Sequence, residues 1–132
     1  MPYLNSLETV TDRKEIGGSM LKTVKGFPDF ILKFPQIRLP PGVAGQGNLL
    51  DASQGQVVFH TIPKGQIVPL HKHKDSWAFL VAGRLKVTLS KEYFIAEAGM
   101  DWLIPAGTDH GGEAIEHSLL VEVFSEKRFS SE

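Results

Sequence analysis

The sequence contains no cysteine, almost no net charge and no long apolar run, and each absence excludes a class of protein. Without cysteine among its 132 residues, it can have no disulfide scaffold, thiolate metal site or cysteine nucleophile. The 14 Lys and Arg residues nearly balance the 15 Asp and Glu residues, so no attraction to nucleic acid or to an anionic membrane is expected. The longest stretches without an acid, lysine or arginine are Leu39–Leu50 and Ala52–Pro63. Both are interrupted by glycine or proline, so no membrane span is expected.

The N-terminal part of the chain differs in composition from the rest. Met1–Ser6 lacks a basic segment followed by an apolar run, so we expect no signal peptide and predict a cytoplasmic location. Residues 1–26 are polar apart from a short apolar patch and are too few to hold a core. We therefore expect them to form an arm that packs on a barrel or on a partner subunit, and residues 27–132 to form one domain.

Short apolar segments separated by proline and glycine dominate the chain after Phe27. Segments rich in β-branched and aromatic residues, spaced like short strands between turns, are typical of an all-β sandwich or barrel. Arg84–Ser90 alternates polar and apolar residues as a half-buried strand does. Val81–Arg84 and Ser90–Glu92 resemble hairpin turns. The expected strands are Gly55–Ile62, Ile67–Leu70, Trp77–Val81, Arg84–Leu89, Tyr93–Ala96, Asp101–Ile104 and His117–Phe124, with no helix of any length after residue 26.

Three histidines are spaced like metal ligands. His71 and His73 would project from the same face of a strand, so both imidazoles could reach one point. His110 follows Ile104–Asp109, where Pro and Gly predict a tight turn that could direct a third imidazole toward the first two. An isolated His-x-His pair is more often a solvated polar face, and the neighbouring lysines fit that alternative.

Two longer motifs favour the metal site. Gly65-x5-His71-x-His73, followed by Gly83, resembles the first motif of the cupin superfamily, and Gly99-x5-Pro105-x-Gly107-x2-His110 resembles the second. The resemblance covers about residues 27–128. It implies a cupin double-stranded β-helix, that is, a jelly-roll barrel of two antiparallel sheets with a central pocket, and a homodimer.

The chain departs from this family at the fourth ligand. The family's first motif supplies a Glu or Gln after the second histidine, whereas this chain has Ser76 or Trp77 there, according to the version compared. Asp75 is adjacent, but it would need a β-bulge to replace Ser76. The Asn that closes the second motif is Ala114 here. The expected site is therefore three neutral imidazoles plus water around a divalent Zn, Ni, Fe, Cu or Mn ion, or else a vestigial site without metal.

A carboxylate near the C-terminus is a candidate catalytic group. Glu122 shares a strand face with Leu120 and Phe124, which is costly unless the carboxylate is paired or functional. The chain resembles small cupins of the pectin-degradation type, in which an acid on this strand and an Arg six residues later assist ring opening. Glu122 and Arg128 have that spacing. The alternative is an exposed edge residue or a structural ion pair with an arginine.

The other histidine and aromatic positions favour structural roles. We interpret His60 as a core or interface residue rather than a pocket residue, because its strand neighbours are apolar. Trp77, Phe79 and Trp102 are expected to pack in the core or the pocket wall. His117, in a polar turn, is expected to be exposed.

Two functions remain open from the sequence. The first is a metal-dependent cupin enzyme acting as a lyase, isomerase or oxygenase on a small sugar acid or keto acid, with Glu122 moving a proton. The second is a non-catalytic cupin that binds a small molecule in an apolar pocket. A structural or storage role is less favoured, because so small a domain offers little to store. In each case the partner is a small molecule, with no nucleic acid and no membrane.

Overall fold

The structure, a computed structural model, describes residues 26–130. Of the predicted arm, only Gly26 belongs to this described part, and the rest lies outside it. The elements follow in the order α3 (Asp29–Leu32), β1 (Gln46–Ala52), β2 (Gly55–Ile62), β3 (Ile67–His71), β4 (Ser76–Ala82), β5 (Arg84–Leu89), β6 (Glu92–Glu97), β7 (Asp101–Ile104), β8 (His110–Ala114) and β9 (Ser118–Phe124).

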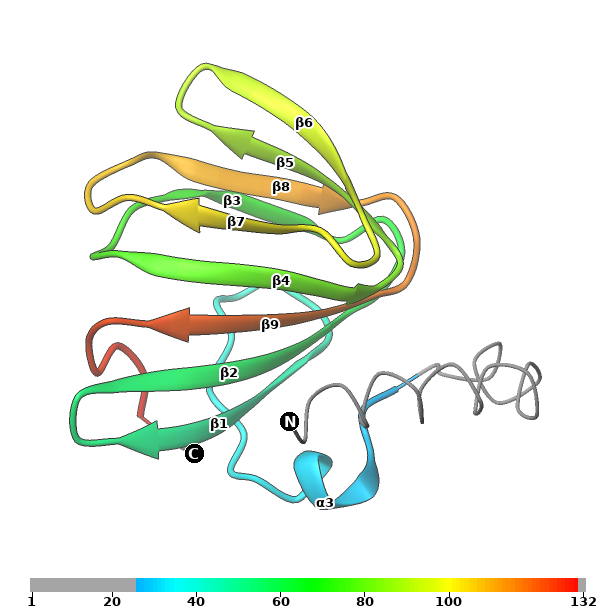
Figure 1. The fold of residues 1–132 in the computed structure, drawn as a ribbon. Helices are drawn as coiled ribbons and strands as arrows, with labels where there is room; N and C mark the ends of the chain where they lie inside the picture. Colours follow the sequence, from blue (N-terminus) through cyan, green and yellow to red (C-terminus); the bar gives the residue numbers. More distant parts are fainter. Residues whose placement is uncertain (1–25, 131–132) are drawn as a thin grey trace, which may run out of the picture.

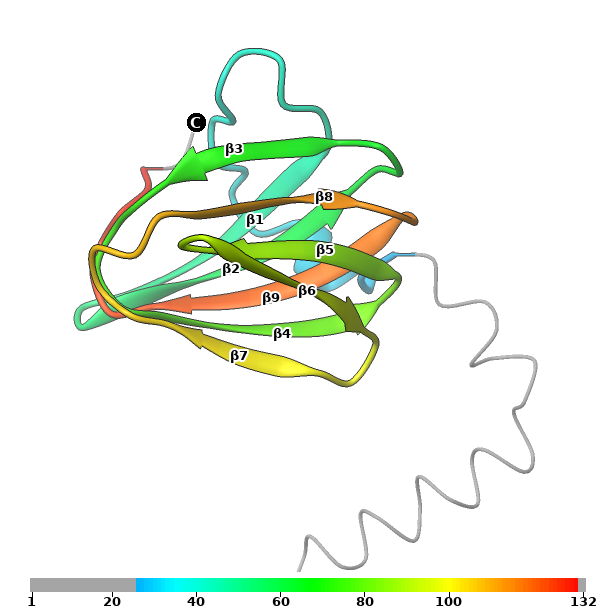
Figure 2. The ribbon, with the colours of Figure 1, turned by 90° about the horizontal axis from the view of Figure 1, so that it is seen from above.

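The strands form two antiparallel sheets that face each other. One sheet has the order β1-β2-β9-β4-β7 and the other the order β3-β8-β5-β6. In Figure 1 the four-stranded sheet lies toward the top, and the five-stranded sheet runs from β7 down to β1. Figure 2 shows the four-stranded sheet above the five-stranded one. The prediction of an all-β jelly-roll barrel is therefore confirmed.

The core lies between the two sheets. Alternate residues of β5, Leu85 and Val87, are buried, while Arg84 and Lys86 face outward, as the alternation in the sequence predicts. The main cluster also contains residues from β4, β6, β8 and β9, namely Ala78, Leu80, Ala96, Ala114 and Leu120. A second cluster of Ile37, Leu49, Val58 and Phe124 closes the end of the barrel beside β1 and β2.

Two strands and one short helix of the structure were not predicted from the sequence. The sequence analysis missed β1 and β8, which contain glycine and polar residues of low β propensity and are held by their neighbours β2 and β5. It also missed the four-residue helix α3, which is too short to show a periodic pattern. The turn Ser90–Glu92 does join the paired strands β5 and β6 as a hairpin.

The segment Val81–Arg84 is not a hairpin turn, because it connects two different sheets. Gly83 has a φ of 92°, and a Cβ atom there would contact Ser118 Oγ and the His117 carbonyl oxygen. The glycine therefore allows the chain to leave β4 in the five-stranded sheet and begin β5 in the other. A local turn signal does not reveal whether the two strands pair, and that is why the sequence misled.

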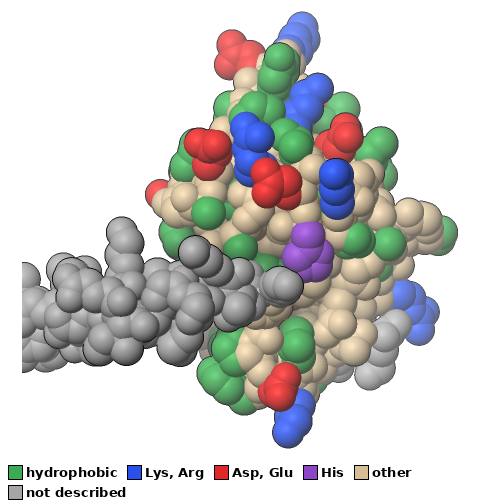
Figure 3. Space-filling view, turned by 90° about the vertical axis from the view of Figure 1, so that its right-hand side faces the viewer, with side chains coloured by type: hydrophobic (Ala, Val, Ile, Leu, Met, Phe, Trp, Pro, Cys, Tyr) green, Lys and Arg blue, Asp and Glu red, His purple; other side chains and the backbone are tan. Residues whose placement is uncertain are grey.

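Figure 3 shows how charged side chains are distributed on one face of the molecule. On the described part of that face, acidic and basic side chains are interspersed rather than gathered by sign. Across residues 26–130, helix α3 is far too short to cross a bilayer. The exposed position expected for His117 is confirmed.

Candidate metal and substrate site

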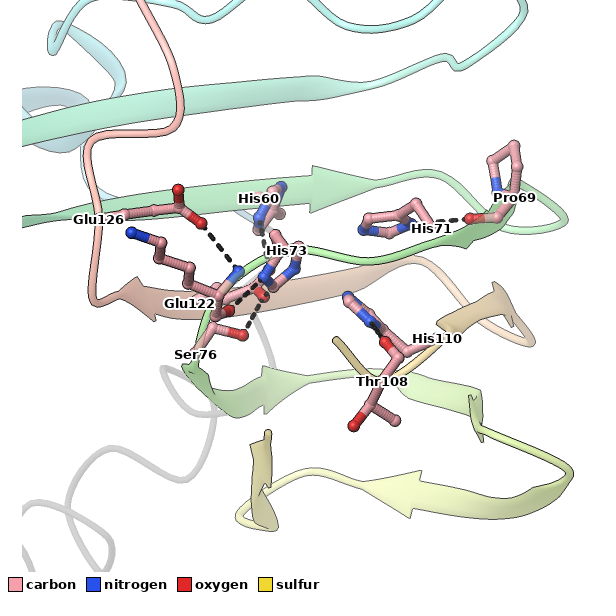
Figure 4. A network of polar contacts seen from close by, with 10 residues as sticks. His60, Pro69, His71, His73, Ser76, Thr108, His110, Glu122 and Glu126 are labelled. Atoms are coloured by element: carbon pink, nitrogen blue, oxygen red, sulfur yellow. Dashed lines mark hydrogen bonds and ion pairs between the residues drawn. The ribbon is translucent and has the colours of Figure 1, made fainter. Parts of the chain in front are cut away.

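The three predicted ligand histidines come together at one end of the barrel (Figure 4). His71 ends β3 and pairs with His110, the first residue of β8. His73 lies in the loop after β3, so the expectation that both residues of the His-x-His pair lie on one strand is wrong. The ring centroids of His71 and His73 are nevertheless 5.4 Å apart, and those of His71 and His110 are 4.2 Å apart. One potential ligand atom from each ring lies within 4.8 Å of the others.

The turn before His110 is tied to the loop that carries His73. Gly107, with a φ of 76°, donates its backbone N–H to the His73 carbonyl oxygen at 2.9 Å. The side chain of Asp75 accepts a hydrogen bond from the Ala106 N–H at 2.7 Å. Asp75 therefore stabilises this turn and does not exchange places with Ser76, which excludes the bulge considered from the sequence.

Hydrogen bonds to backbone carbonyls orient all three rings. Nδ1 donates to Pro69 O at 2.8 Å in His71, to Lys74 O at 2.6 Å in His73 and to Thr108 O at 2.9 Å in His110. A carbonyl oxygen can only accept, so Nδ1 carries the proton and Nε2 of the neutral ring has a free lone pair. This is the arrangement that commonly fixes histidine as a metal ligand.

Two of the three Nε2 atoms make no hydrogen bond within the described part of the chain. Nε2 of His73 and Nε2 of His110 are buried without a hydrogen bond among the described residues. Burial lowers the pKa of His71 and of His110, because desolvation disfavours the charged ring. Neutral, buried and unpartnered imidazole nitrogens fit a divalent ion of the Zn, Cu, Fe or Ni type.

Glu122 lies directly beside these rings and is buried, which contradicts the reading of an exposed edge residue. It belongs to β9, and its side chain accepts a hydrogen bond from Ser76 Oγ at 2.9 Å. Its other oxygen lies 3.3 Å from His60 Nε2. Among the described residues, His60 Nε2 makes no hydrogen bond of acceptable geometry. The contact with Glu122 is therefore an electrostatic attraction and not an aligned hydrogen bond.

Opposing effects act on the pKa of Glu122. Burial on its own raises the pKa of this carboxyl group, but the close contact with His60 and its charge lower it. The hydrogen bond from Ser76 and the charge of His73 lower it further. The net pKa lies below its usual value, so the group is an ionised carboxylate at neutral pH.

A cavity of about 190 Å³ opens from this cluster into the barrel. Glu122 and Arg128 both line it, together with His71 and His110, and most of its remaining wall is apolar. Trp102 forms part of that wall, as expected. A small molecule in this cavity would therefore meet imidazole rings, the carboxylates of Glu122 and Glu113, the guanidinium group of Arg128 and the ammonium group of Lys86.

Arg128 is held in the cavity wall by the C-terminal segment. Its guanidinium carbon lies 5.1 Å from the Phe129 ring centroid and 6.0 Å from that of Phe124. The side-chain oxygen of Gln56, which is 2% exposed, accepts the N–H groups of Arg128 and Phe129, both at 2.8 Å. Its amide nitrogen donates to Phe129 O at 2.7 Å and to Asp51 at 3.2 Å. Gln56 thus uses its whole hydrogen-bonding capacity to fix this segment.

Two residues of the site were missed by sequence reasoning. His60 lines the cavity, so its interpretation as a core or interface residue is wrong. The signal was its alternation with Val58 and Ile62, which puts it on the inward face of β2. Gln56 lies on the same face and could have been found in the same way. Trp77 and Phe79 instead face outward from β4, and Trp77 is 39% exposed.

Comparisons with known proteins agree with this geometry. The family model described as the cupin domain matches residues 58–124. KdgF from Halomonas sp. is 26% identical with a TM-score of 0.62, covering 70% of this chain and 88% of its own. An RmlC-like cupin from Shewanella frigidimarina is 20% identical with a TM-score of 0.66, covering 78% and 90%, and supports the fold alone.

Oxalate decarboxylase from Bacillus subtilis, described in a variant form, is 26% identical with a TM-score of 0.63. The match covers 76% of this chain but only 29% of that enzyme. No curated protein sequence gave a significant match.

Proposed function

Because the chain belongs to the cupin domain family, we propose that it binds a divalent metal ion through His71, His73 and His110 and acts on a small sugar acid or keto acid. The convergence of three Nε2 atoms, each opposite an Nδ1–H bonded to a carbonyl, is the observation that carries the proposal. The likeness to oxalate decarboxylase, whose name gives an acid as its substrate, supports an acidic substrate.

A bound ion would supply Lewis-acid polarisation of a carbonyl or hydroxyl group. The protein's own contribution comes from the two predicted catalytic residues, which line the same cavity. Arg128 would bind the substrate carboxylate, since a guanidinium group matches a carboxylate in shape and charge. Glu122 would exchange a proton with the bound molecule, because it is the buried carboxylate of the cavity wall that lies beside His73. Isomerase, lyase and oxygenase reactions all fit these roles.

A non-catalytic binding function is the second candidate. It is favoured by the mostly apolar cavity wall and by the lack of a Glu or Gln ligand at Ser76. In that case the histidines would be vestigial, and the cavity would hold a small molecule without metal.

Metal analysis separates the two candidates. Protein purified without a His tag is expected to contain close to one divalent ion per chain, measured by inductively coupled plasma mass spectrometry. Almost no metal after incubation with Zn, Ni, Fe, Cu and Mn salts would reject the enzyme proposal. The metal-replete protein is then mixed with an unsaturated uronate, whose ultraviolet absorbance is expected to fall. An unchanged absorbance would reject the proposal that an unsaturated sugar acid is the substrate.

We further propose that the chain forms a homodimer through the outer face of its five-stranded sheet. A row of apolar side chains crosses all five strands in register, namely Leu50, Val57, Val123, Trp77 and Leu103. With about 4.8 Å between strands, the row is roughly 19 Å long. An antiparallel sheet that faces water on one side normally alternates with polar residues there, so this face is built to be covered.

Residues 27–34 already cover part of this face beside β1 and β2. A second copy of the chain fits the remaining part because it is almost uncharged. Among the outward positions of the five described strands, the charged residue is Asp101, and its side chain accepts a hydrogen bond from Trp77 Nε1 at 2.8 Å. Two such faces can pack on one another without an unpaired charge. Phe27 packs edge-on against Phe59 on the same side of the sheet, so the first described residues lie next to the proposed interface.

The dimer proposal predicts the effect of one lysine substitution. The unmodified protein is expected to have twice the chain mass of 14.6 kDa in sedimentation equilibrium. Leu103→Lys, at a side chain that is 61% exposed, is expected to shift the mass to that of one chain. Ile67→Lys, at a 60% exposed residue of the other sheet, is the matched control and is expected to stay dimeric. The interface would be disproved if the unmodified protein were monomeric, as expected if the arm alone covered the face. It would also be disproved if the Leu103→Lys variant stayed dimeric.

A further inference from the structure

Ser76 leaves a space at the position where related proteins carry a ligand, and Glu122 fills it. Ser76 faces inward from β4 and is 3% exposed. Its neighbour in register on β9 is Phe124, and Glu122 lies opposite Ala78, the next inward residue of β4. The Glu122 carboxylate reaches diagonally across to accept the Ser76 hydroxyl at 2.9 Å (Figure 4). A carboxylate from β9 therefore occupies the place of a longer side chain on β4.

Glu122 also faces the nitrogen of His73 that is proposed to bind the metal ion. Nδ1 of His73 carries its proton toward Lys74 O, so Nε2 of the neutral ring presents a lone pair. That nitrogen lies 3.8 Å from Glu122 Oε2, and the His73 side chain is 2% exposed. Nε2 has no hydrogen-bond partner among the described residues. A metal ion bound at this nitrogen would therefore have the carboxylate oxygen within reach as a further ligand.

The remaining contacts of Glu122 leave Oε2 available. Oε1 is the oxygen that approaches His60, at 3.3 Å. Oε2 is the oxygen that lies near both Ser76 and His73. A carboxylate can bind a metal ion through one oxygen while its other oxygen contacts a histidine, so a ligand role for Oε2 leaves the contact of Oε1 with His60 in place.

We propose that Glu122 is the fourth protein ligand of the metal ion, supplied by β9 in place of the ligand missing from β4. The site then has three imidazoles and one carboxylate rather than three imidazoles and water. The carboxylate lowers the net charge of the loaded site by one and adds a hard oxygen ligand, which favours Mn²⁺ and Fe²⁺ relative to an all-imidazole site. The inference rests on the proposed metal binding at the three histidines.

The experiment measures Mn²⁺ affinity from the electron paramagnetic resonance signal of the free ion. Glu122→Ala and Glu122→Gln are each expected to weaken Mn²⁺ binding by about 100-fold or more, beyond the effect of losing a residue that only orients a ligand. Glu92→Gln, which neutralises an exposed carboxylate on β6 outside the cavity, is the matched control and is expected to bind as the unmodified protein does. Circular dichroism confirms that each variant is folded.

A relocation variant tests the replacement directly. Ser76→Glu combined with Glu122→Ala moves the carboxylate from β9 to β4 and is expected to recover Mn²⁺ affinity to within about tenfold of the unmodified protein. With Co²⁺, the visible absorption bands of the unmodified protein and of this relocation variant are expected to match, and those of Glu122→Ala to differ. Unchanged Mn²⁺ affinity in Glu122→Ala and Glu122→Gln would overturn the inference and leave the three-histidine proposal standing. A failure of the unmodified protein to bind any metal would overturn both.

Discussion

A protein carrying His71→Ala and His110→Ala together is expected to lose its bound metal ion completely and to keep its barrel. The two residues would supply ligands from both segments of the proposed site, and His73 alone would not hold a divalent ion against water. The fold should persist because the main apolar cluster lies between the sheets and contains neither histidine. The loss of two ring-to-carbonyl hydrogen bonds should lower the free energy of unfolding by about 2 kcal/mol.

Metal content by mass spectrometry and thermal unfolding by circular dichroism measure the two effects separately. His117→Ala removes an exposed histidine seven residues after His110 and is the control, expected to retain full metal content. A double variant that keeps its metal would show that the ligands have been assigned to the wrong residues. A double variant that fails to fold would show that the site is part of the core.

Gln56→Leu is expected to release the C-terminal segment and to remove Arg128 from the cavity wall. The substitution deletes four hydrogen bonds, three of them to backbone groups of Arg128 and Phe129. At about 1 kcal/mol for each bond, the free energy of unfolding should fall by roughly 4 kcal/mol at most. The actual loss should be smaller where the released groups reach water.

Trypsin provides a direct test, since it cleaves after Arg128 only when the segment can leave the barrel. Gln56→Leu is expected to be cut there much faster than the unmodified protein, with metal content unchanged because none of the three histidines contacts Gln56. Gln54→Leu, at an exposed glutamine two residues away, should be cut at the original rate. Equal cleavage of all three proteins would mean that Gln56 does not hold the segment.

The parts of the fold that depend on local pattern were predictable from the sequence. The range Gly55–Ile62 is a strand with the predicted ends, because β-branched residues between turn signals define it locally. Strand β8 was missed because Gly111 and Gly112 disfavour a strand by propensity. Both glycines are needed there, since a Cβ atom would contact the carbonyl oxygen of Val68 or of Lys86. That requirement exists only after the neighbouring strands have assembled.

The same distinction holds for the candidate site. His71, His73 and His110 could be proposed because they fall in two short motifs with fixed spacing. The group around Glu122 could not, because Ser76 and His60 reach it across strand pairings that join residues 46 and 62 positions apart. A sequence shows which residues share a strand face, but it does not show which faces meet.

The ring-to-carbonyl bonds of His71 and His110 have a consequence for how an ion would be captured. Each ring is bonded to the residue two positions before it in the chain, so its orientation is fixed within its own short segment. Little side-chain rotation then remains to be lost when an ion arrives, which reduces the entropic cost of coordination. Disturbing either turn should consequently appear as slower and weaker capture of the ion, even where every ligand is still in place.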